Sequence, residues 1–513
     1  MVQLRLKDHA YPALNYLNNM RNMRPSVVRT VALYTCLSLS ITLALVLFAT
    51  QGLPTFAEDS LNRFSYPRPP PAHPIVAHEY GPAFDGSKHT GPASQQEHAH
   101  ASDWRFDYAR DGKNYGLSEA QCDLAFPELY KEVDRAVAHR KTLGQNISLD
   151  DVDVGWRGDG IVRAMIRDNQ LYIIDAHNVR DHNHRPRSIA SLHSLHRAIS
   201  AYSGKLPNIE FTITDHDGAL FSKQDNHTTW GYARLKEQET LWLIPDFGLW
   251  GWPDVGLRSY AELQSILDET EDDFLDKEPK LVWRGALGNA GGGLRRALIK
   301  ESEGQTWSDV QSFSWNNKTD LRSKILTMED HCGYMFVAQT EGNTYSGRLK
   351  YLLNCHSVVL SHELNWIEHY HHLLIPSGIG QNFIKLKRDF SDLRSTMRRI
   401  LLPSYLETTA RGIADNARAT FREKYLTPAA NACYWRALIR SWASVQGFEP
   451  QVWIEEEGNG EGGAFVGIGP KKTTRKRPRG TPFEAYAIME VTEWSLPAKG
   501  RVVCVDEDGE DGD

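Results

Sequence analysis

One apolar run near the N-terminus constrains the topology of this chain more than any other feature. Residues 30–49, TVALYTCLSLSITLALVLFA, carry no charge, and 20 helical residues suffice to cross a hydrocarbon core of about 30 Å. Basic side chains dominate residues 1–29, and positively charged flanks stay in the cytoplasm. We therefore predict a cytoplasmic tail at 1–29, a transmembrane signal-anchor at 30–49 and a luminal remainder. A cleaved signal peptide is the alternative.

The segments that flank the central region are too polar to form a core. Residues 50–102 are rich in proline and should be a disordered stem between the membrane and a folded domain. Residues 454–513 pass from EEEGNGEGG through KKTTRKRPRG to DEDGEDGD. We predict that this segment is a disordered charged tail.

Composition excludes several classes of protein. A mean hydropathy of −0.47 rules out a multi-span membrane protein, and 14 tryptophans are too many for a largely disordered chain. The net charge of −7 gives no global basic field, so no nucleic-acid partner is expected. Cys332, Cys355 and Cys433 could pair in an oxidising lumen, but their spacing leaves the connectivity open. Candidate N-glycosylation sequons begin at Asn146, Asn226 and Asn317.

The central residues alternate between two patterns. Short β-branched or aromatic runs, such as 208–214, 280–283, 334–339 and 356–361, are separated by longer amphipathic stretches. This alternation is typical of an α/β fold with parallel sheets. The length of the region predicts two α/β lobes, 103–275 and 276–453, with a cleft between them.

Two carboxylates follow the first of these strands, in the sequence Thr214-Asp215-His216-Asp217-Gly218. Ligands of open α/β sheets bind beyond the carboxyl ends of strands, so Asp215 or Asp217 could be a general base that removes a hydroxyl proton. An Asp-Gly turn with capping side chains is an equally good interpretation of the spacing alone. A D-x-D pair that holds a divalent cation is a third.

Two glycine-containing loops follow later strands. The first, WRGALGNAGGGLRR, contains Arg284, Gly285 and Arg295, and the second, EGNTYSGRLK, contains Ser346 and Arg348. Glycines allow close backbone approach, and arginines near a helix start favour an anion such as a diphosphate. A plain flexible loop and a capped helix with a surface arginine are the respective alternatives.

These motifs, in this order, resemble the Rumi-like protein O-glucosyltransferases and fungal capsule-associated xylosyltransferases of glycosyltransferase family 90. The resemblance covers about residues 205–445. It rests on T-D-H-D-G, W-R-G, E-G-x-x-Y-S-x-R-L-K-Y-L-L-x-C, S-V-V-L, E-L-x-W-I-E-H-Y-H-H-L-L-I-P and A-x-x-A-C-Y-W. The block from Glu341 to Lys350 is the most specific of them.

The resemblance implies a GT-B fold and inverting transfer of a sugar, glucose or xylose, from a UDP-sugar to a glycan or protein hydroxyl, with no metal or other cofactor. Asp217 would be the catalytic carboxylate, with Asp215 as the fallback. The diphosphate residues would be Arg284, Gly285, Ser346 and Arg348, with Arg295 as a substitute because the loop after Arg284 departs from the family pattern. Residues 103–275 would be the acceptor-side lobe and 276–453 the nucleotide-sugar-binding lobe.

The predicted anchor and stem resemble those of type II membrane transferases, so we expect the catalytic domain in the lumen of the Golgi or endoplasmic reticulum. Two other functions stay open. The chain could be a metal-dependent D-x-D transferase, or a catalytically inactive sugar-binding or scaffolding protein. For the latter, Trp242, Trp250 and Trp252 would be stacking platforms, unless they belong to the core.

Overall fold

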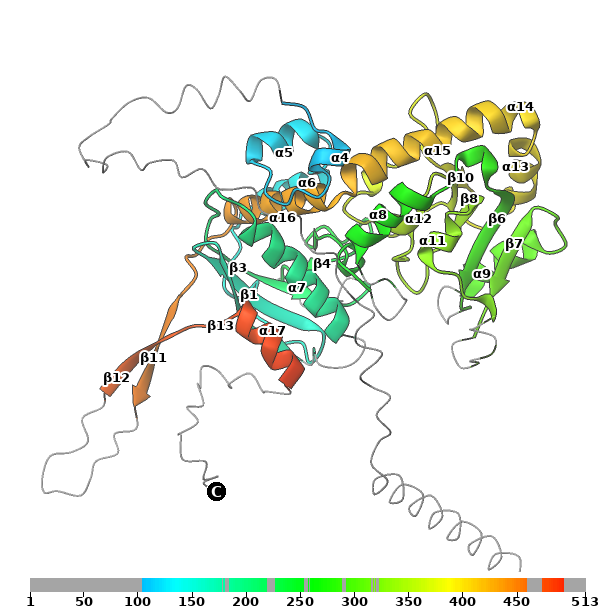
Figure 1. Ribbon diagram of the computed structural model, residues 1–513. Coiled ribbons are helices and arrows are strands. Elements are labelled where there is room, and N and C mark those ends of the chain that lie inside the picture. The colour runs from blue at the N-terminus through cyan, green and yellow to red at the C-terminus, as the bar shows by residue number, and fades with distance from the viewer. Residues whose placement is uncertain are drawn as a thin grey trace, which may run out of the picture. The chain divides into compact units, whose positions relative to one another are not determined.

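The computed structural model describes residues 104–177, 179, 184–218, 227–252, 257, 259–287, 292–314, 317, 319, 323–458 and 473–492 (Figure 1). The predicted cytoplasmic tail, transmembrane signal-anchor and stem lie outside these residues. The chain divides into two units, 1–90 and 91–513, and every described residue belongs to the second. Within the described part, none of the helices combines the length and apolar character needed to span a membrane.

The first sheet has six strands in the order β13-β2-β1-β3-β4-β5. β1 (Ile161–Arg167) and β2 (Gln170–His177) form a hairpin, and β3 (Ile209–Thr214) pairs antiparallel with β1. β4 (Trp230–Gly231) and β5 (Trp242–Leu243) continue the sheet parallel to β3. The hairpin turn consists of Asp168 and Asn169, whose φ angles of 50° and 57° suit the two-residue turns that match strand twist.

The second sheet is entirely parallel, in the order β10-β9-β8-β6-β7. Its strands are β6 (Glu278–Gly285), β7 (Ser308–Ser312), β8 (Tyr334–Gln339), β9 (Val358–His362) and β10 (Ile384–Leu386). Numbered from β6, this is the doubly wound order 2-1-3-4-5, which reverses direction between β6 and β8. The predicted α/β class is confirmed, and the second sheet is parallel as expected. The first sheet is mixed, because β13, β2, β1 and β3 pair antiparallel and only β4 and β5 continue in parallel.

Helices cover both sheets. Those before the second sheet are α4 (Tyr108–Asp111), α5 (Glu119–Ala125), α6 (Lys131–Thr142), α7 (Arg185–Ser200) and α8 (Tyr260–Thr270). The others are α9 (Gly292–Ser302), α11 (Met328–His331), α12 (Leu349–Leu352), α13 (Leu393–Ile400), α14 (Pro403–Tyr405), α15 (Arg411–Ala417), α16 (Pro428–Ala443) and α17 (Phe483–Thr492). α14 and α16 begin at prolines, which are tolerated in a first helical turn.

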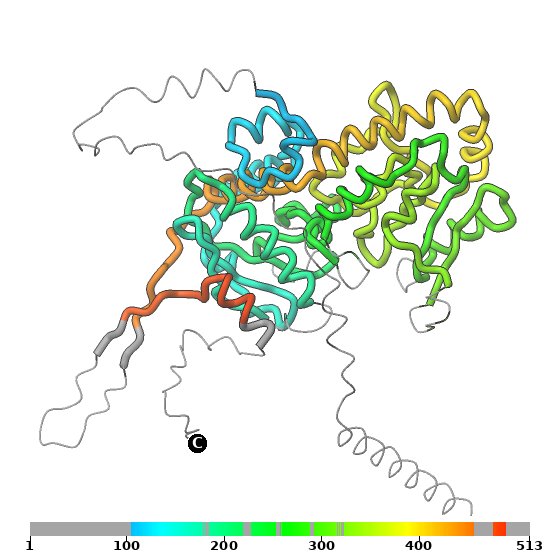
Figure 2. The backbone as a smooth tube through the Cα atoms, in the orientation of Figure 1, coloured from blue at the N-terminus to red at the C-terminus, as the bar shows by residue number. Residues whose placement is uncertain are grey.

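The chain returns to the first sheet at α16, which follows the second sheet in sequence. Figures 1 and 2 show α16 beside α5 and α6. Its Trp435 donates to Ser194 on α7 (2.9 Å), and its Trp442 packs edge-on against Trp230 of β4 and Trp242 of β5. These rings are buried, so Trp242 belongs to the core and is not a stacking platform.

A disulfide between Cys122 and Cys433 fastens α5 to α16, and a second one joins Cys332 to Cys355. The first closes a separation of 311 residues and the second only 23. Replacing Cys122 and Cys433 by serine should lower the free energy of unfolding by about 2–5 kcal/mol, because the cross-link restricts the unfolded chain. Urea unfolding at neutral pH measures this loss.

The double serine variant of Cys332 and Cys355 is the matched control. A shorter closed loop removes less entropy from the unfolded chain, so we expect a smaller loss. Equal losses for the two variants would contradict the loop-closure explanation.

Residues after 453 are more ordered than the sequence suggested. β11 (Trp453–Gly458) pairs antiparallel with β12 (Thr473–Pro478), β13 (Thr481–Pro482) pairs with β2, and α17 follows. The prediction of a disordered tail was therefore wrong for the described residues of this segment. Charged side chains dominate its composition, but the backbone hydrogen bonds of a strand do not require apolar residues, and Phe483 and Tyr486 supply a buried anchor.

Candidate active site

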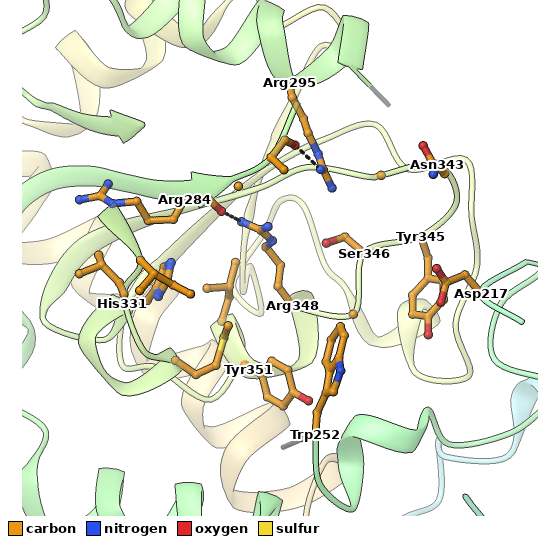
Figure 3. A pocket seen from close by; sticks show the side chains of 18 of the residues that line it. Asp217, Trp252, Arg284, Arg295, His331, Asn343, Tyr345, Ser346, Arg348 and Tyr351 are labelled. Carbon is orange, nitrogen blue, oxygen red and sulfur yellow. Dashed lines mark hydrogen bonds between the residues drawn. The ribbon is translucent and has the colours of Figure 1, made fainter. Parts of the chain in front are cut away.

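A cavity of about 370 Å³ opens where the strand order of the second sheet reverses (Figure 3). Residues that follow β6 and β8 form one wall. The opposite side is formed by Arg187 of α7, Asp217 after β3, and Phe247 and Trp252 after β5. The cavity thus lies at the position where doubly wound sheets bind ligands, and elements of the first sheet complete it.

Asp217 is the carboxylate of this cavity. Arg187 donates to its Oδ1 at 2.7 Å, and the Arg187 guanidinium also lies 5.3 Å from the ring centroid of Phe247. Burial raises the pKa of the Asp217 carboxyl, Arg187 opposes this effect, and Asp246 adds to it. Because 47% of the side chain remains exposed at the cavity mouth, we expect solvent to keep the rise small. The group can therefore accept a proton near neutral pH.

Asp215 lies in different surroundings. It is buried, and its two carboxylate oxygens accept hydrogen bonds from His184 (2.7 Å) and from the Ser188 hydroxyl. It does not line the cavity. A D-x-D cation site requires oxygens of both aspartates to point at one ion. Asp215 and Asp217 do not meet this requirement. Asp215 holds the start of α7 against the end of β3.

The guanidinium of Arg284 is held by contacts within the protein. Its guanidinium pairs through Nη2 with both oxygens of Asp309 at 2.9 Å, and it donates to the backbone carbonyls of Asp309 and Lys324. Figure 3 shows this side chain extending away from Arg348. The side chain thus does not take the predicted position at a diphosphate. The backbone of Gly285 lies beside Arg348 instead, since a Cβ at Gly285 would lie 3.1 Å from the Arg348 guanidinium.

Arg295 and Arg348 face the cavity without an acidic partner. Within the described part of the chain no carboxylate pairs with either one; each donates to a single backbone carbonyl, and both Nε atoms are buried without a hydrogen-bond partner. Burial, and secondly the charge of Arg295, lower the pKa of Arg348 to about 9. Burial also lowers the pKa of Arg295. Two desolvated cations this close together form an incomplete site that an anion would complete.

The loop after β8 presents Ser346 between these arginines and Asp217 (Figure 3). Glu341 fixes the start of the loop, because its Oε1 accepts from the backbone N–H groups of Asn365 and Trp366 at 2.8 Å. Its backbone N–H donates to His362 Nε2 (2.9 Å). This histidine therefore positions a loop.

A buried carboxylate connects this loop to the first sheet. Asp246, just after β5, accepts from the Tyr345 hydroxyl and forms a 2.5 Å ion pair with Lys350. All three side chains are buried. Gly248 allows this contact, because a Cβ there would lie 2.8 Å from Lys350 Cε and 2.9 Å from Asp246 Oδ1. Ser346 and Arg348 lie between Tyr345 and Lys350 in sequence, so the connection fixes them relative to Asp217.

The far end of the cavity is apolar. Phe313, Leu326, Met328 and Leu352 line it together with His331. Burial lowers the pKa of His331 to about 4, so the ring is neutral at pH 7. Its Nδ1 lies 2.7 Å from the Thr327 carbonyl and must carry the proton, which leaves Nε2 as an acceptor. This end can hold a flat ring that offers one N–H.

One group of potential metal ligands occurs among the described residues, Asp159, His184 and His216. The Arg157 guanidinium lies 2.7 Å from His216 Nε2 and 3.0 Å from Asp159 Oδ1, and His184 Nδ1 is bonded to Asp215. A side-chain cation already neutralises this group. We therefore do not assign a metal to it.

The structure brings Asp217, Gly285, Arg295, Ser346 and Arg348 together as predicted neighbours of one cavity. It adds three residues that sequence reasoning missed, Arg187, Asp246 and His331. No motif marks them, because their roles depend on contacts between distant segments. Of the sequons, Asn146 and Asn317 are exposed, and Asn226 lies outside the described residues.

The sequence profile of Glycosyl transferase family 90 matches residues 123–457. Protein O-glucosyltransferase 3 of Mus musculus is 24% identical over 258 residues, which are 48% of this chain and 49% of that protein. O-glucosyltransferase rumi of Drosophila pseudoobscura pseudoobscura is 28% identical over 131 residues, 25% of this chain and 30% of that protein. The chain thus spans about half the length, or less, of these relatives.

Proposed function

Because this chain belongs to glycosyltransferase family 90, we propose that its cavity binds a UDP-sugar and transfers the sugar, with inversion, to a hydroxyl of a glycan or protein. The observation that carries the proposal is that Arg295 and Arg348, which have no acidic partner among the described residues, lie in the same cavity as the Asp217 carboxylate. Glucose and xylose are the donor sugars that we would test first.

Arg295 and Arg348 would bind the diphosphate. Both guanidinium groups are already desolvated, so an anion gains charge-assisted hydrogen bonds without paying again to dehydrate them. The Ser346 hydroxyl would donate to a phosphate oxygen between them. Preorganised donors of this kind stabilise the charge that develops on the leaving UDP.

The uracil ring would occupy the apolar end of the cavity. Neutral His331 offers Nε2 as an acceptor, and the N3–H of uracil is a matching donor. Phe313 and Met328 supply apolar contact for the ring faces. This places the diphosphate at the arginines and the sugar toward Asp217.

Asp217 would be the general base. The acceptor hydroxyl gives its proton to the carboxylate while its oxygen attacks the anomeric carbon of the donor. The new carbon–oxygen bond forms as the bond from the anomeric carbon to the β-phosphate oxygen breaks, and UDP leaves with that electron pair. Attack opposite the leaving group inverts the anomeric configuration.

The two sheets with a cavity at their junction support a GT-B arrangement, and the two disulfides support an oxidising compartment such as the Golgi or endoplasmic reticulum lumen. Both remain parts of this proposal. The membrane anchor at residues 30–49 is a separate prediction from the sequence.

Calorimetric titration of the purified protein with UDP, UMP and GDP tests the donor site. We expect UDP to bind, UMP to bind at least tenfold more weakly because it lacks the β-phosphate, and GDP to fail at the His331 end. The matched control is Arg296→Ala, an exposed neighbour of Arg295, which should bind UDP normally. Equal affinity for UDP and UMP would refute the role of the two arginines.

A further inference from the structure

We infer that residues 479–486, here called the C-terminal clamp, position the catalytic carboxylate by holding helix α7. This inference rests on the proposed function and concerns residues beyond the matched range 123–457. In Figure 1, α17 lies against α7, the helix whose first turn contacts both aspartates. The inference rests on three sets of contacts. The clamp contacts the first sheet, the clamp contacts α7, and α7 contacts the two aspartates.

The clamp is anchored to the first sheet. Arg479 donates to both oxygens of Glu210, a buried residue of β3, at 2.6 and 2.7 Å. Arg163 of β1 donates to the same carboxylate at 2.7 Å. Gly480 then turns with a φ of 84°, and β13 adds to the edge of the sheet beside β2. A buried carboxylate shared by two arginines is a strong attachment for a segment so close to the end of the chain.

The clamp also covers α7. Phe483 is 1% exposed, and its ring lies 5.0 Å from that of His193 and 5.2 Å from that of His196, both on α7. Glu484 forms a 3.1 Å contact with His196 Nε2. Tyr486 is fully buried one turn later. The clamp therefore fills one side of α7 with aromatic rings and fixes it against the sheet.

Helix α7 contributes side-chain partners to both aspartates. Arg187 binds Asp217, Ser188 binds Asp215, and His184, the residue just before the helix, binds Asp215 as well. A second contact joins α7 to the segment after β5, because His193 stacks on Trp250 with an interplanar angle of 6°, two residues before the cavity-lining Trp252. A shift of α7 would thus move Arg187 and the Asp217 carboxylate that it holds.

The test compares two truncations of the chain and two point substitutions in the full chain. The first truncation ends at Pro478 and removes the clamp; the control ends at Thr492 and keeps it. Phe483→Ala weakens the contact with α7, and Ile488→Ala, an exposed residue of the same helix, is its matched control. UDP release, UDP affinity and the pH profile of kcat/KM are measured for each, below the melting temperature of every variant.

We expect the Pro478 truncation and Phe483→Ala to lose roughly 10- to 100-fold in kcat, with UDP affinity unchanged, because a small misplacement of a catalytic group is enough for such a loss. The acid limb of the profile should move to higher pH. Among the described residues, the charged and titratable groups that act on Asp217 are Arg187, His216, Asp246 and Lys350, and displacement of Arg187 would remove the cation that is hydrogen-bonded to it.

Hydrogen exchange provides a readout that does not depend on turnover. Amides of residues 188–196 on α7, which have helical hydrogen bonds to lose, should exchange faster in Phe483→Ala than in Ile488→Ala, while those of β6 and β8 stay protected. Unchanged kcat and unchanged exchange would overturn the inference, as would an equal loss of kcat and UDP affinity, which indicates general destabilisation. If the wild-type protein releases no UDP but the exchange result holds, the proposed function fails and the attachment of α7 stands.

Discussion

Replacing Asp217 by asparagine should lower kcat by about 10²- to 10⁴-fold, the usual contribution of a general base. UDP affinity should not fall, because the carboxylate lies away from the two arginines (Figure 3). Stability should change little, since Asp217 is half-exposed and Arg187 keeps its contact with Phe247. Initial rates of UDP release and a UDP titration measure the two effects separately.

Asp215→Asn is the contrasting variant. Its carboxylate is buried and bonded to His184 and Ser188, so its loss should lower the melting temperature as well as the rate.

The pH profile of the wild-type protein provides a second test of Asp217. Activity requires ionised Asp217 and is lost as pH falls through its pKa, which burial raises above the ordinary value, so the acid limb should lie above that of a free aspartate. A variant Asp217→Asn with wild-type kcat would remove Asp217 from the mechanism.

Replacing Arg348 by alanine should cost about 2–4 kcal/mol of transition-state stabilisation, or roughly 10²- to 10³-fold in kcat/KM, because the guanidinium would neutralise the leaving diphosphate. Stability should not fall in parallel. Arg348 is a desolvated cation that is repelled by Arg295, so its removal relieves an unfavourable charge. Lysine should restore only part of the rate, because it lacks the planar fork of donors.

Arg296→Ala serves again as the control, since Arg296 is exposed on the same helix as Arg295. Kinetics in a range of donor concentrations and thermal melts separate catalysis from folding. If Arg348→Ala lowers the melting temperature and leaves kcat/KM intact, Arg348 has a structural role and the diphosphate site lies elsewhere.

The second sheet and its loops were predictable because their signals are local. Apolar runs at 280–283, 334–339 and 356–361 are buried parallel strands, and the loops after the first two carry the arginines and serine of the cavity. Ligand sites of parallel sheets occur at strand ends, so the sequence positions of Arg295, Ser346 and Arg348 already indicated their neighbourhood. Asp217 follows the same rule after β3.

The parts that were missed depend on pairings across long separations. Arg284 is in the most glycine-rich motif, yet its guanidinium is taken by Asp309, which no motif marks. Asp246 looks like an ordinary turn residue until Tyr345 and Lys350 meet it from about 100 residues away. The strand β13 is only two residues long, and the pairing of Arg479 with Glu210 on the first sheet, which holds the segment before it, spans 269 residues of sequence.

Measurement of UDP release shows most directly whether this protein is a metal-independent transferase that uses a UDP-sugar. The purified protein is incubated with UDP-glucose, UDP-xylose and other UDP-sugars, each with and without EDTA, beside the Asp217→Asn variant. We expect release from at least one UDP-sugar, at a rate that EDTA does not change and that the variant loses. Release that EDTA abolishes would contradict the arginine site, and absence of both UDP binding and release would contradict the transferase itself.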